Sequence, residues 1–237
     1  MVSLENHYIM NRMKETTNLM MQKVTILITF YLSLITFSSC SESASDDDEY
    51  ANWQQRNEQY LAAVVSDSLR QPGWQRIKNY SLNPDTEGAV SDYIYVKVVE
   101  SGDLVGNASE RYETETGCPA FTDSVRVAYQ GRLIPSKTYP EGKVFDGTVY
   151  GTYSNKTNAN TKFLISSSSM TSGFCTALQH MRRGDHWRVY IPTELAYGAS
   201  GSGTNIPAYS LLIFEMTLID FSPAGQTMPV WSSRQIK

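Results

Sequence analysis

The stretch "SGFCTALQHMRRGDHWRVYIPTELAYG", residues 172–198, changes its hydrophobic period halfway along. Its first half places apolar residues at the spacing of one helical face, at Phe174, Ala177, Leu178 and Met181. Gly184 follows as a C-terminal cap. The second half alternates apolar and polar residues as a half-buried strand does, at Trp187, Val189 and Ile191. The stretch therefore predicts a short helix that leads directly into a strand.

Alternation marks further strands on both sides of this stretch. They are "DYIYVKVVE" (92–100), "SVRVAYQGRL" (124–133), "TKFLIS" (161–166) and "LLIFEMTLIDF" (211–221). In the last of these, one face collects Leu212, Phe214, Met216 and Leu218. Several such strands around one short helix predict an α+β fold, in which a curved antiparallel β-sheet wraps around the helix.

Residues 50–71 are predicted to form an N-terminal helix before the sheet. Its apolar face carries Trp53, Tyr60, Leu61 and Val64, and Pro72-Gly73 ends it. Two interpretations stay open: this face packs on the chain's own domain, or it mediates self-association. We expect residues 72–89 to be a connector, residues 90–222 the sheet domain and residues 223–237 a C-terminal tail.

The N-terminal 40 residues have the composition of a signal peptide. The uncharged run "VTILITFYLSLITF" (24–37) follows Lys23 and is too short to span a membrane. Its ending "FSSC" resembles the lipobox of bacterial lipoproteins, which implies a lipid on Cys40. The acidic tether "SESASDDDE" (41–49) is similar to an export signal of some Gram-negative lipoproteins. These resemblances imply a chain in the cell envelope, lipid-anchored to the outer membrane and facing the periplasm or the surface.

The charge and the cysteines argue against several classes of function. A net charge of −4 provides no basic field, so we expect no nucleic-acid partner. The sequence has no C-x-x-C, and Cys175, His180 and His186 do not stack on one helical face, so no metal site is predicted. They are expected to be a core thiol and two surface imidazoles. In an exported protein Cys118 and Cys175 could form a disulfide, and their spacing does not decide whether they pair.

The loop "LAYGASGSGTNIP" (195–207) is rich in glycine, but it matches neither of two catalytic loops. A phosphate-binding loop would need Gly-Lys-Ser/Thr and a following helix, whereas a strand follows here. A nucleophile elbow would need a histidine downstream of its serine, and the last histidine is His186. We expect this loop to join the last two strands at the rim of the curved sheet.

Read in order, these segments resemble the FKBP-type peptidyl-prolyl isomerases over residues 90–222. The resemblance is carried by "VAYQGRL", "VFDGT", "TKFLI", the stretch quoted first and "NIPAYSLLIFEMTLIDF". It implies an apolar pocket for the proline ring of a polypeptide, without cofactor or metal. The implied catalytic residues are Asp146, Tyr197 and Phe214. The implied substrate-binding residues are Tyr129, Phe145, Met170, Thr171, Phe174 and Ile206. The glycine-rich loop would be a flap between the pocket strands, with Ile206 as its apolar contact.

The same resemblance implies a role for each polar group. Tyr197 would donate its hydroxyl to the substrate carbonyl, and the Thr171 N–H would hold the peptide backbone beyond it. Asp146 would accept from Tyr129. Phe174 stands where the family has Trp, and Thr161 stands where it has an aromatic residue, so we expect reduced activity and a more polar rim. A module that binds proline segments without catalysis is the alternative.

The lipobox leads to a direct test. Metabolic lipid labelling in a bacterial host should mark the wild-type chain and leave Cys40→Ser unlabelled, because the lipid is attached to this thiol. Labelling that persists in the variant would exclude an anchor at this position.

Overall fold

The computed structural model describes residues 21, 49–68, 70–102, 114–154 and 159–228. The chain divides into two units, residues 1–48 and 49–237, and the fold below is that of the second. The predicted lipidation site Cys40, the acidic tether up to residue 48 and residues 229–237 lie outside the described residues, as does the predicted signal peptide apart from Met21. Across the described ranges, no helix has both the length and the apolar character needed to cross a membrane.

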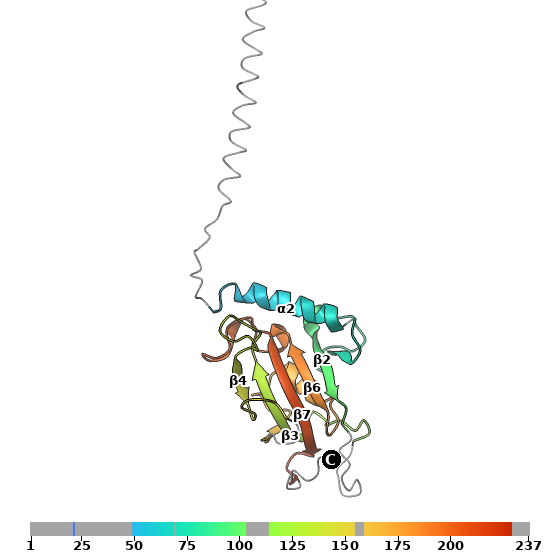
Figure 1. Ribbon diagram of the computed structural model, residues 1–237. Coiled ribbons are helices and arrows are strands. Elements are labelled where there is room, and N and C mark those ends of the chain that lie inside the picture. Colours follow the sequence, from blue (N-terminus) through green and yellow to red (C-terminus); the bar gives the residue numbers. More distant parts are fainter. Residues whose placement is uncertain (1–20, 22–48, 69, 103–113, 155–158, 229–237) are drawn as a thin grey trace, which may run out of the picture. The chain divides into compact units, whose positions relative to one another are not determined.

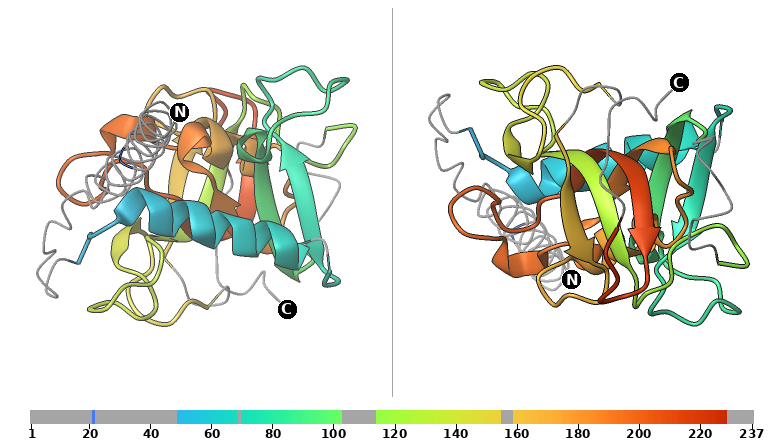
Figure 2. Two further views of the ribbon diagram at one scale, coloured as in Figure 1. Left: turned by 90° about the horizontal axis from the view of Figure 1, so that it is seen from above. Right: turned by 90° about the horizontal axis from the view of Figure 1, so that it is seen from below.

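The second unit is a curved antiparallel sheet that wraps around a short helix, as predicted (Figures 1 and 2). Its helices and strands are α2 (Trp53–Ser68), β1 (Trp74–Lys78), β2 (Tyr93–Glu100), β3 (Ser124–Arg132), β4 (Val144–Gly147), β5 (Thr161–Leu164), α3 (Ser172–Leu178), β6 (His186–Ile191) and β7 (Leu212–Ser222). The strand order is β1-β2-β6-β7-β3-β4, and β5 pairs with β3 beside β4. Every one of these pairings is antiparallel.

The sheet wraps around helix α3, which is shorter than the sequence predicted. It begins after Thr171, whose side chain accepts a hydrogen bond from the backbone N–H of Phe174, and it ends at Leu178. Met181 lies beyond the helix but is fully buried, because the chain stays against the sheet until it turns at Gly184 (φ +86°). Gly173 lets the helix approach β6 closely, since a Cβ there would lie 2.3 Å from Ile191 Cγ2.

Strand β7 carries the predicted apolar face and one feature that its periodicity did not reveal. Leu212, Phe214, Met216 and Leu218 are all buried, which confirms the prediction. Between Leu218 and Asp220 the pairing with β3 shifts by one residue, as in a β-bulge. The bulge changes the parity of the strand, so Ile219 and Phe221 are the buried apolar residues that follow. The core thus continues to the end of the strand.

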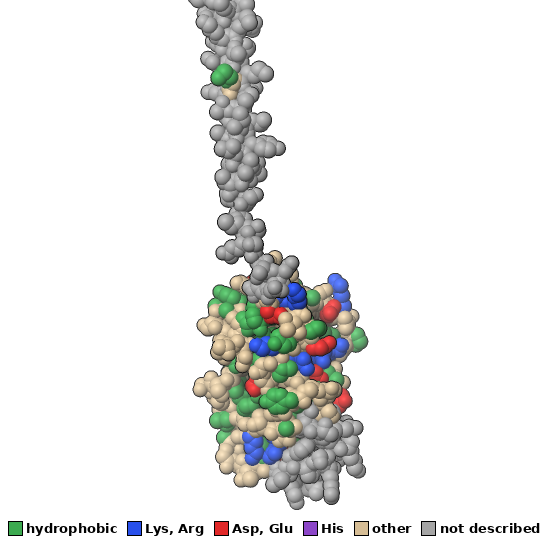
Figure 3. All heavy atoms as spheres, turned by 60° about the vertical axis from the view of Figure 1, so that its left-hand side comes forward, with side chains coloured by type: hydrophobic (Ala, Val, Ile, Leu, Met, Phe, Trp, Pro, Cys, Tyr) green, Lys and Arg blue, Asp and Glu red, His purple; other side chains and the backbone are tan. Residues whose placement is uncertain are grey.

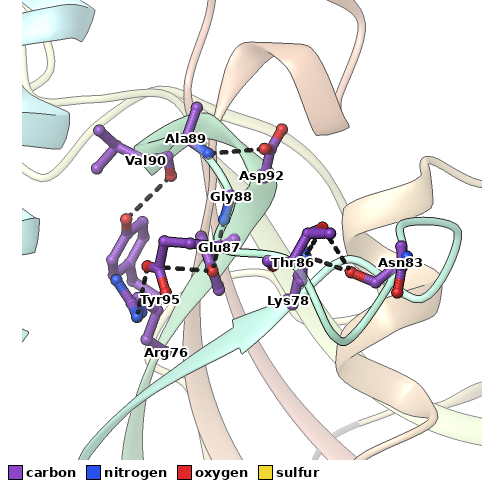
Figure 4. A network of polar contacts seen from close by, with 11 residues as sticks. Arg76, Lys78, Asn83, Thr86, Glu87, Gly88, Ala89, Val90, Asp92 and Tyr95 are labelled. Atoms are coloured by element: carbon purple, nitrogen blue, oxygen red, sulfur yellow. Dashed lines mark hydrogen bonds and ion pairs between the residues drawn. The ribbon is translucent and has the colours of Figure 1, made fainter.

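The predicted connector 72–89 is wrong in part, because it contains β1. This strand pairs with β2, and Trp74 stacks on Tyr190 of β6 with ring centroids 5.4 Å apart. The loop between β1 and β2 is held by the side chains of β1, as Figure 4 shows. Lys78 Nζ donates to the carbonyl oxygens of Asn83 and Thr86, and other contacts come from Arg76. The sheet therefore begins well before residue 90.

Helix α2 lies across one end of the sheet (Figures 1 and 2). Its apolar face is buried on the chain's own domain, with Trp53 and Val64 each only 6% exposed. Tyr60 packs on Tyr190 at a centroid distance of 6.4 Å. The packing interpretation is therefore correct, and the face that we had considered for self-association is covered by the sheet domain. The helix is also shorter than the predicted 50–71.

Among the described cysteines and histidines, Cys175 and His180 follow the prediction and His186 does not. Cys118 and Cys175 are free thiols, so the two are not joined. Cys175 is buried, which raises the pKa of its thiol to about 11. His180 is exposed as expected. His186 is buried instead, because it begins β6 and stacks on Tyr153 at 4.8 Å.

Charged side chains of both signs are interspersed on the face that Figure 3 draws. Hydrophobic side chains are scattered among them on the same face. A mixed surface of this kind attracts neither polyanions nor polycations strongly.

A partly buried ionic cluster on β6 and β7 predicts how stability depends on pH. Glu215 lies 3.0 Å from His186 Nε2 and accepts a 2.8 Å hydrogen bond from Arg188. These partners, His186 first, lower the pKa of Glu215 to about 2. Because the pKa of Glu215 is lower in the folded state, its ionised carboxylate stabilises the fold. This contribution is fully present when the pH is above the unfolded-state pKa of about 4.3, and it is lost as the pH falls towards 2.

We expect Glu215→Gln to lower the free energy of unfolding at pH 6 by about 3 kcal/mol. The difference from wild type should shrink between roughly pH 4.5 and pH 2, since the wild-type carboxylate is protonated there. Urea denaturation at several pH values measures both quantities. A difference that does not change with pH would contradict this role of Glu215.

Candidate active site

A cavity of about 210 Å³ opens between the sheet and the N-terminal end of α3. It is lined by Tyr129, Asp146, Phe163, Ser169, Met170, Thr171, Phe174, Tyr197 and Phe214. These residues come from β3, β4, β5, the segment before α3, α3 itself, the start of the flap and β7. Seven of them are site residues predicted from the sequence, so segments far apart in the chain meet at one place as the resemblance implied.

Aromatic rings form the apolar part of the cavity. Phe174 on α3 packs edge to face on Phe214 at 4.9 Å and on Tyr129 at 5.7 Å. Phe163 closes the group, 5.6 Å from Tyr129 and 6.0 Å from Phe174. Edge-to-face contacts at such distances stabilise aromatic groups beyond the burial of their area. The cavity therefore has a rigid apolar wall whose rings hold one another in place.

The polar groups lie at the rim. Tyr129 donates its hydroxyl to Asp146 Oδ2 at 2.8 Å, and the other carboxylate oxygen accepts from the Gly147 N–H at 2.8 Å. Burial raises the pKa of Tyr129, and the hydrogen bond to Asp146 raises it further. Tyr129 therefore stays protonated at neutral pH and keeps donating to the carboxylate. The predicted contact between these two side chains is confirmed.

Two hydrogen-bond donors at the rim have no partner within the described part of the chain. One is the Tyr197 hydroxyl, on a side chain that is 36% exposed. Burial and the neighbouring charge of Asp146 raise its pKa, so it also remains a donor. The other is the backbone N–H of Thr171, the residue whose side chain caps α3. Both donors are free to bind acceptors of a ligand.

Two predicted site residues do not line the cavity. Phe145 lies behind the wall and packs edge to face on Phe214 at 5.6 Å. Gly131 makes room for this pair, because a Cβ there would lie within 2.7 Å of both rings. Ile206 is buried in the core, and its backbone pairs with Ser202 inside the flap. Both residues support the site without facing into the cavity.

Two lining residues were missed from the sequence. Phe163 lines the cavity and packs on Tyr129, so β5 provides an aromatic ring there although Thr161 stands where the family has one. The signal was present, because Phe163 alternates with Ile165 in the predicted strand. Alternation alone does not separate a ring that lines a cavity from one that packs in the core. Ser169 belongs to a serine-rich segment that carries no pattern from which its position could have been predicted.

Comparisons with known proteins agree with this geometry. Residues 117–219 match the family described as FKBP-type peptidyl-prolyl cis-trans isomerase. The macrophage infectivity potentiator of Trypanosoma cruzi is 37% identical over 108 residues, which are 46% of this chain and 48% of that protein. The FKBP-type 22 kDa peptidyl-prolyl cis-trans isomerase of Escherichia coli is 38% identical over 106 residues, 45% of each chain.

The chain spans about half the length of these curated relatives. Among solved structures, FkpA from Escherichia coli is 24% identical with a TM-score of 0.49, over 82% of this chain and 72% of that chain. The matched residues run from just before β3 into β7 and include every residue that lines the cavity. The match to the FKBP-type peptidyl-prolyl cis-trans isomerase family therefore covers residues 117–219, the part of the chain that holds the cavity.

Proposed function

We propose that this chain is a peptidyl-prolyl cis-trans isomerase that acts on X-Pro bonds of exported polypeptides. The observation that carries the proposal is the cavity itself, an aromatic bowl of about 210 Å³ with two unpartnered donors at its rim. It is smaller than the pockets that hold drug-sized ligands, and its size suits one small apolar ring. A proline side chain is such a ring, and the carbonyl groups on either side of it are acceptors.

Such a bowl is sufficient for the chemistry. An X-Pro amide resists rotation by about 18–20 kcal/mol, because the twisted bond loses its resonance, and uncatalysed exchange takes tens to hundreds of seconds. No covalent bond forms or breaks, so no nucleophile is required. A site that binds the twisted amide more tightly than either planar isomer lowers the barrier by differential binding.

Each group at the rim has a role in this proposal. Tyr197 donates to the substrate carbonyl as the amide rotates, and the Thr171 N–H holds the backbone on the far side of the proline. Asp146 fixes the Tyr129 hydroxyl, and its exposed carboxylate lies at the mouth of the cavity. Phe214 and Phe174 exclude water from the ring, which strengthens these hydrogen bonds.

We further propose that the chain acts in the envelope of a Gram-negative bacterium, anchored to the outer membrane through a lipid on Cys40. The apolar run before the "SSC" motif and the acidic tether support this location. A relative from Legionella longbeachae, 35% identical over 107 residues, is named outer membrane protein MIP. In that compartment newly exported chains with slow X-Pro bonds would be the substrates.

A proline-binding module with little catalysis is the second candidate. The observation that favours it is Phe174, which stands where the resemblance places an indole and therefore fills less of the pocket floor. Binding of proline peptides by the wild-type chain without any acceleration of exchange would select this candidate.

Tyr197→Phe is the sharpest test of catalysis. It removes a hydroxyl that has no partner in the described residues, so the free energy of unfolding should be unchanged. The loss of one transition-state hydrogen bond should lower kcat/KM by roughly ten- to a hundredfold, or about 1.4 to 2.7 kcal/mol. A protease-coupled assay with X-Pro peptides measures the rate, and urea denaturation measures the stability.

Tyr139→Phe is the matched control, because this tyrosine is similarly exposed (40%) but does not line the cavity. It should leave both quantities unchanged. Asp146→Asn is a less clean probe, since Asp146 also holds Tyr129 and the turn at Gly147. Equal kcat/KM for Tyr197→Phe and wild type would contradict the catalytic role of this hydroxyl.

A further inference from the structure

The flap, defined here as residues 197–211, carries Tyr197 at one end and joins β7 at the other. It contains a short 3-10 turn at Gly198–Ser200 and an isolated pairing of Ser202 with Ile206. Neither contact ties the flap to the sheet. Ile206 is buried in the core midway along the loop, and hydrogen bonds hold the two ends of the loop.

The β7 end of the flap is held by α2. Trp53 donates its indole N–H to Ser210 Oγ at 2.8 Å, and the Leu211 backbone N–H donates to Asn57 Oδ1 at 2.8 Å. Asn57 Nδ2 in turn donates to the Trp53 carbonyl at 2.7 Å, which orients the amide. All four residues are buried, with exposures of 2–6%. Buried hydrogen bonds of this kind are costly to break, since water does not replace the lost partner.

The two ends of the flap are joined to each other beside Tyr197. The Tyr209 N–H donates to the Gly198 carbonyl at 2.9 Å, and Gly198 directly follows Tyr197 in the chain. Tyr209 has a left-handed backbone (φ +61°), which is strained for a bulky residue and persists only where the surroundings hold it. Its next neighbour in the chain, Ser210, is the residue that Trp53 binds.

We propose that α2 is a brace for the flap, and that Trp53 and Asn57 are positioning residues for Tyr197. They hold residues 210 and 211, these keep Tyr209 in its left-handed conformation, and Tyr209 holds Gly198 next to Tyr197. The inference rests on the proposed function for its kinetic consequence. The brace itself is a property of the fold and is measurable without any substrate.

Asn57→Ala removes the acceptor of the Leu211 N–H and frees the Trp53 carbonyl. Amide hydrogen exchange in residues 198–211 should become faster, because the flap opens locally more often. KM for an X-Pro peptide should rise roughly two- to thirtyfold, since binding must now order the flap. The value of kcat should stay close to wild type, because the bound peptide holds Tyr197 in place once the flap has closed.

Ser210→Ala tests the same brace from the flap side and leaves α2 intact, so it remains informative if Asn57→Ala folds poorly. It removes the acceptor of the Trp53 indole and should change flap exchange and KM in the same direction. Val64→Ala is the matched control for helix packing. Val64 lies on the same face of α2 and is 6% exposed, but it belongs to the core and is not a partner of residues 209–211.

The control should lower the melting temperature while leaving KM and flap exchange as in wild type. A structural role alone would reduce the active fraction, and therefore the apparent kcat, without moving KM. If amide hydrogen exchange in the flap is unchanged in both Asn57→Ala and Ser210→Ala, the proposal that α2 braces the flap is wrong. An unchanged KM in both variants would also contradict it. If the wild-type chain shows no isomerase activity, the proposed function fails, and flap exchange together with peptide affinity still decides on the brace.

Discussion

Phe174 packs on Phe214 and on Tyr129, and this aromatic contact joins the helix to the neighbouring strands β7 and β3. A helix of seven residues is too short to be stable alone, so its position depends on what it buries. Every residue of α3 from Gly173 to Leu178 is buried. The same ring that anchors the helix also forms the wall of the cavity, so the core and the candidate site cannot vary independently.

The rim of the cavity is built in a different way. Its polar groups lie on segments that are partly exposed, and each is held by one or two hydrogen bonds rather than by close packing. Asp146 orients Tyr129, Thr171 caps α3, and the flap that carries Tyr197 is attached at its far end to α2. An apolar wall of fixed shape with a lighter, hydrogen-bonded rim allows a peptide to enter without disturbing the core.

Helix α2 lies outside the matched family region, residues 117–219. Together with β1 it lies outside that region but is continuous with the sheet through Trp74, Tyr60 and Tyr190. The domain of this chain is therefore larger than the matched family region. Its extra elements cover one end of the sheet, where the flap returns to β7.

The sequence by itself determined the fold class and most of the site. Periods of two and 3.6 residues depend only on which face of a strand or helix is buried, so the strands and α3 could be read from the chain. The order of the motifs then assigned the seven predicted residues that line the cavity. The hydrophobic alternation was too weak to predict a strand where few apolar residues are present, as in the five residues of β1.

Tertiary structure alone decided the remaining points. The bulge after Leu218, the placement of Phe163 in the cavity rather than the core, and the docking of α2 all depend on which partner lies opposite. The hydrophobic period of a strand or helix cannot distinguish between two apolar environments, because an aromatic ring in a core and one in a cavity wall are buried alike. Burial of α2 against its own sheet, instead of a second chain, was settled by contacts between residues about 130 to 160 positions apart, at Tyr60–Tyr190, Trp53–Ser210 and Asn57–Leu211.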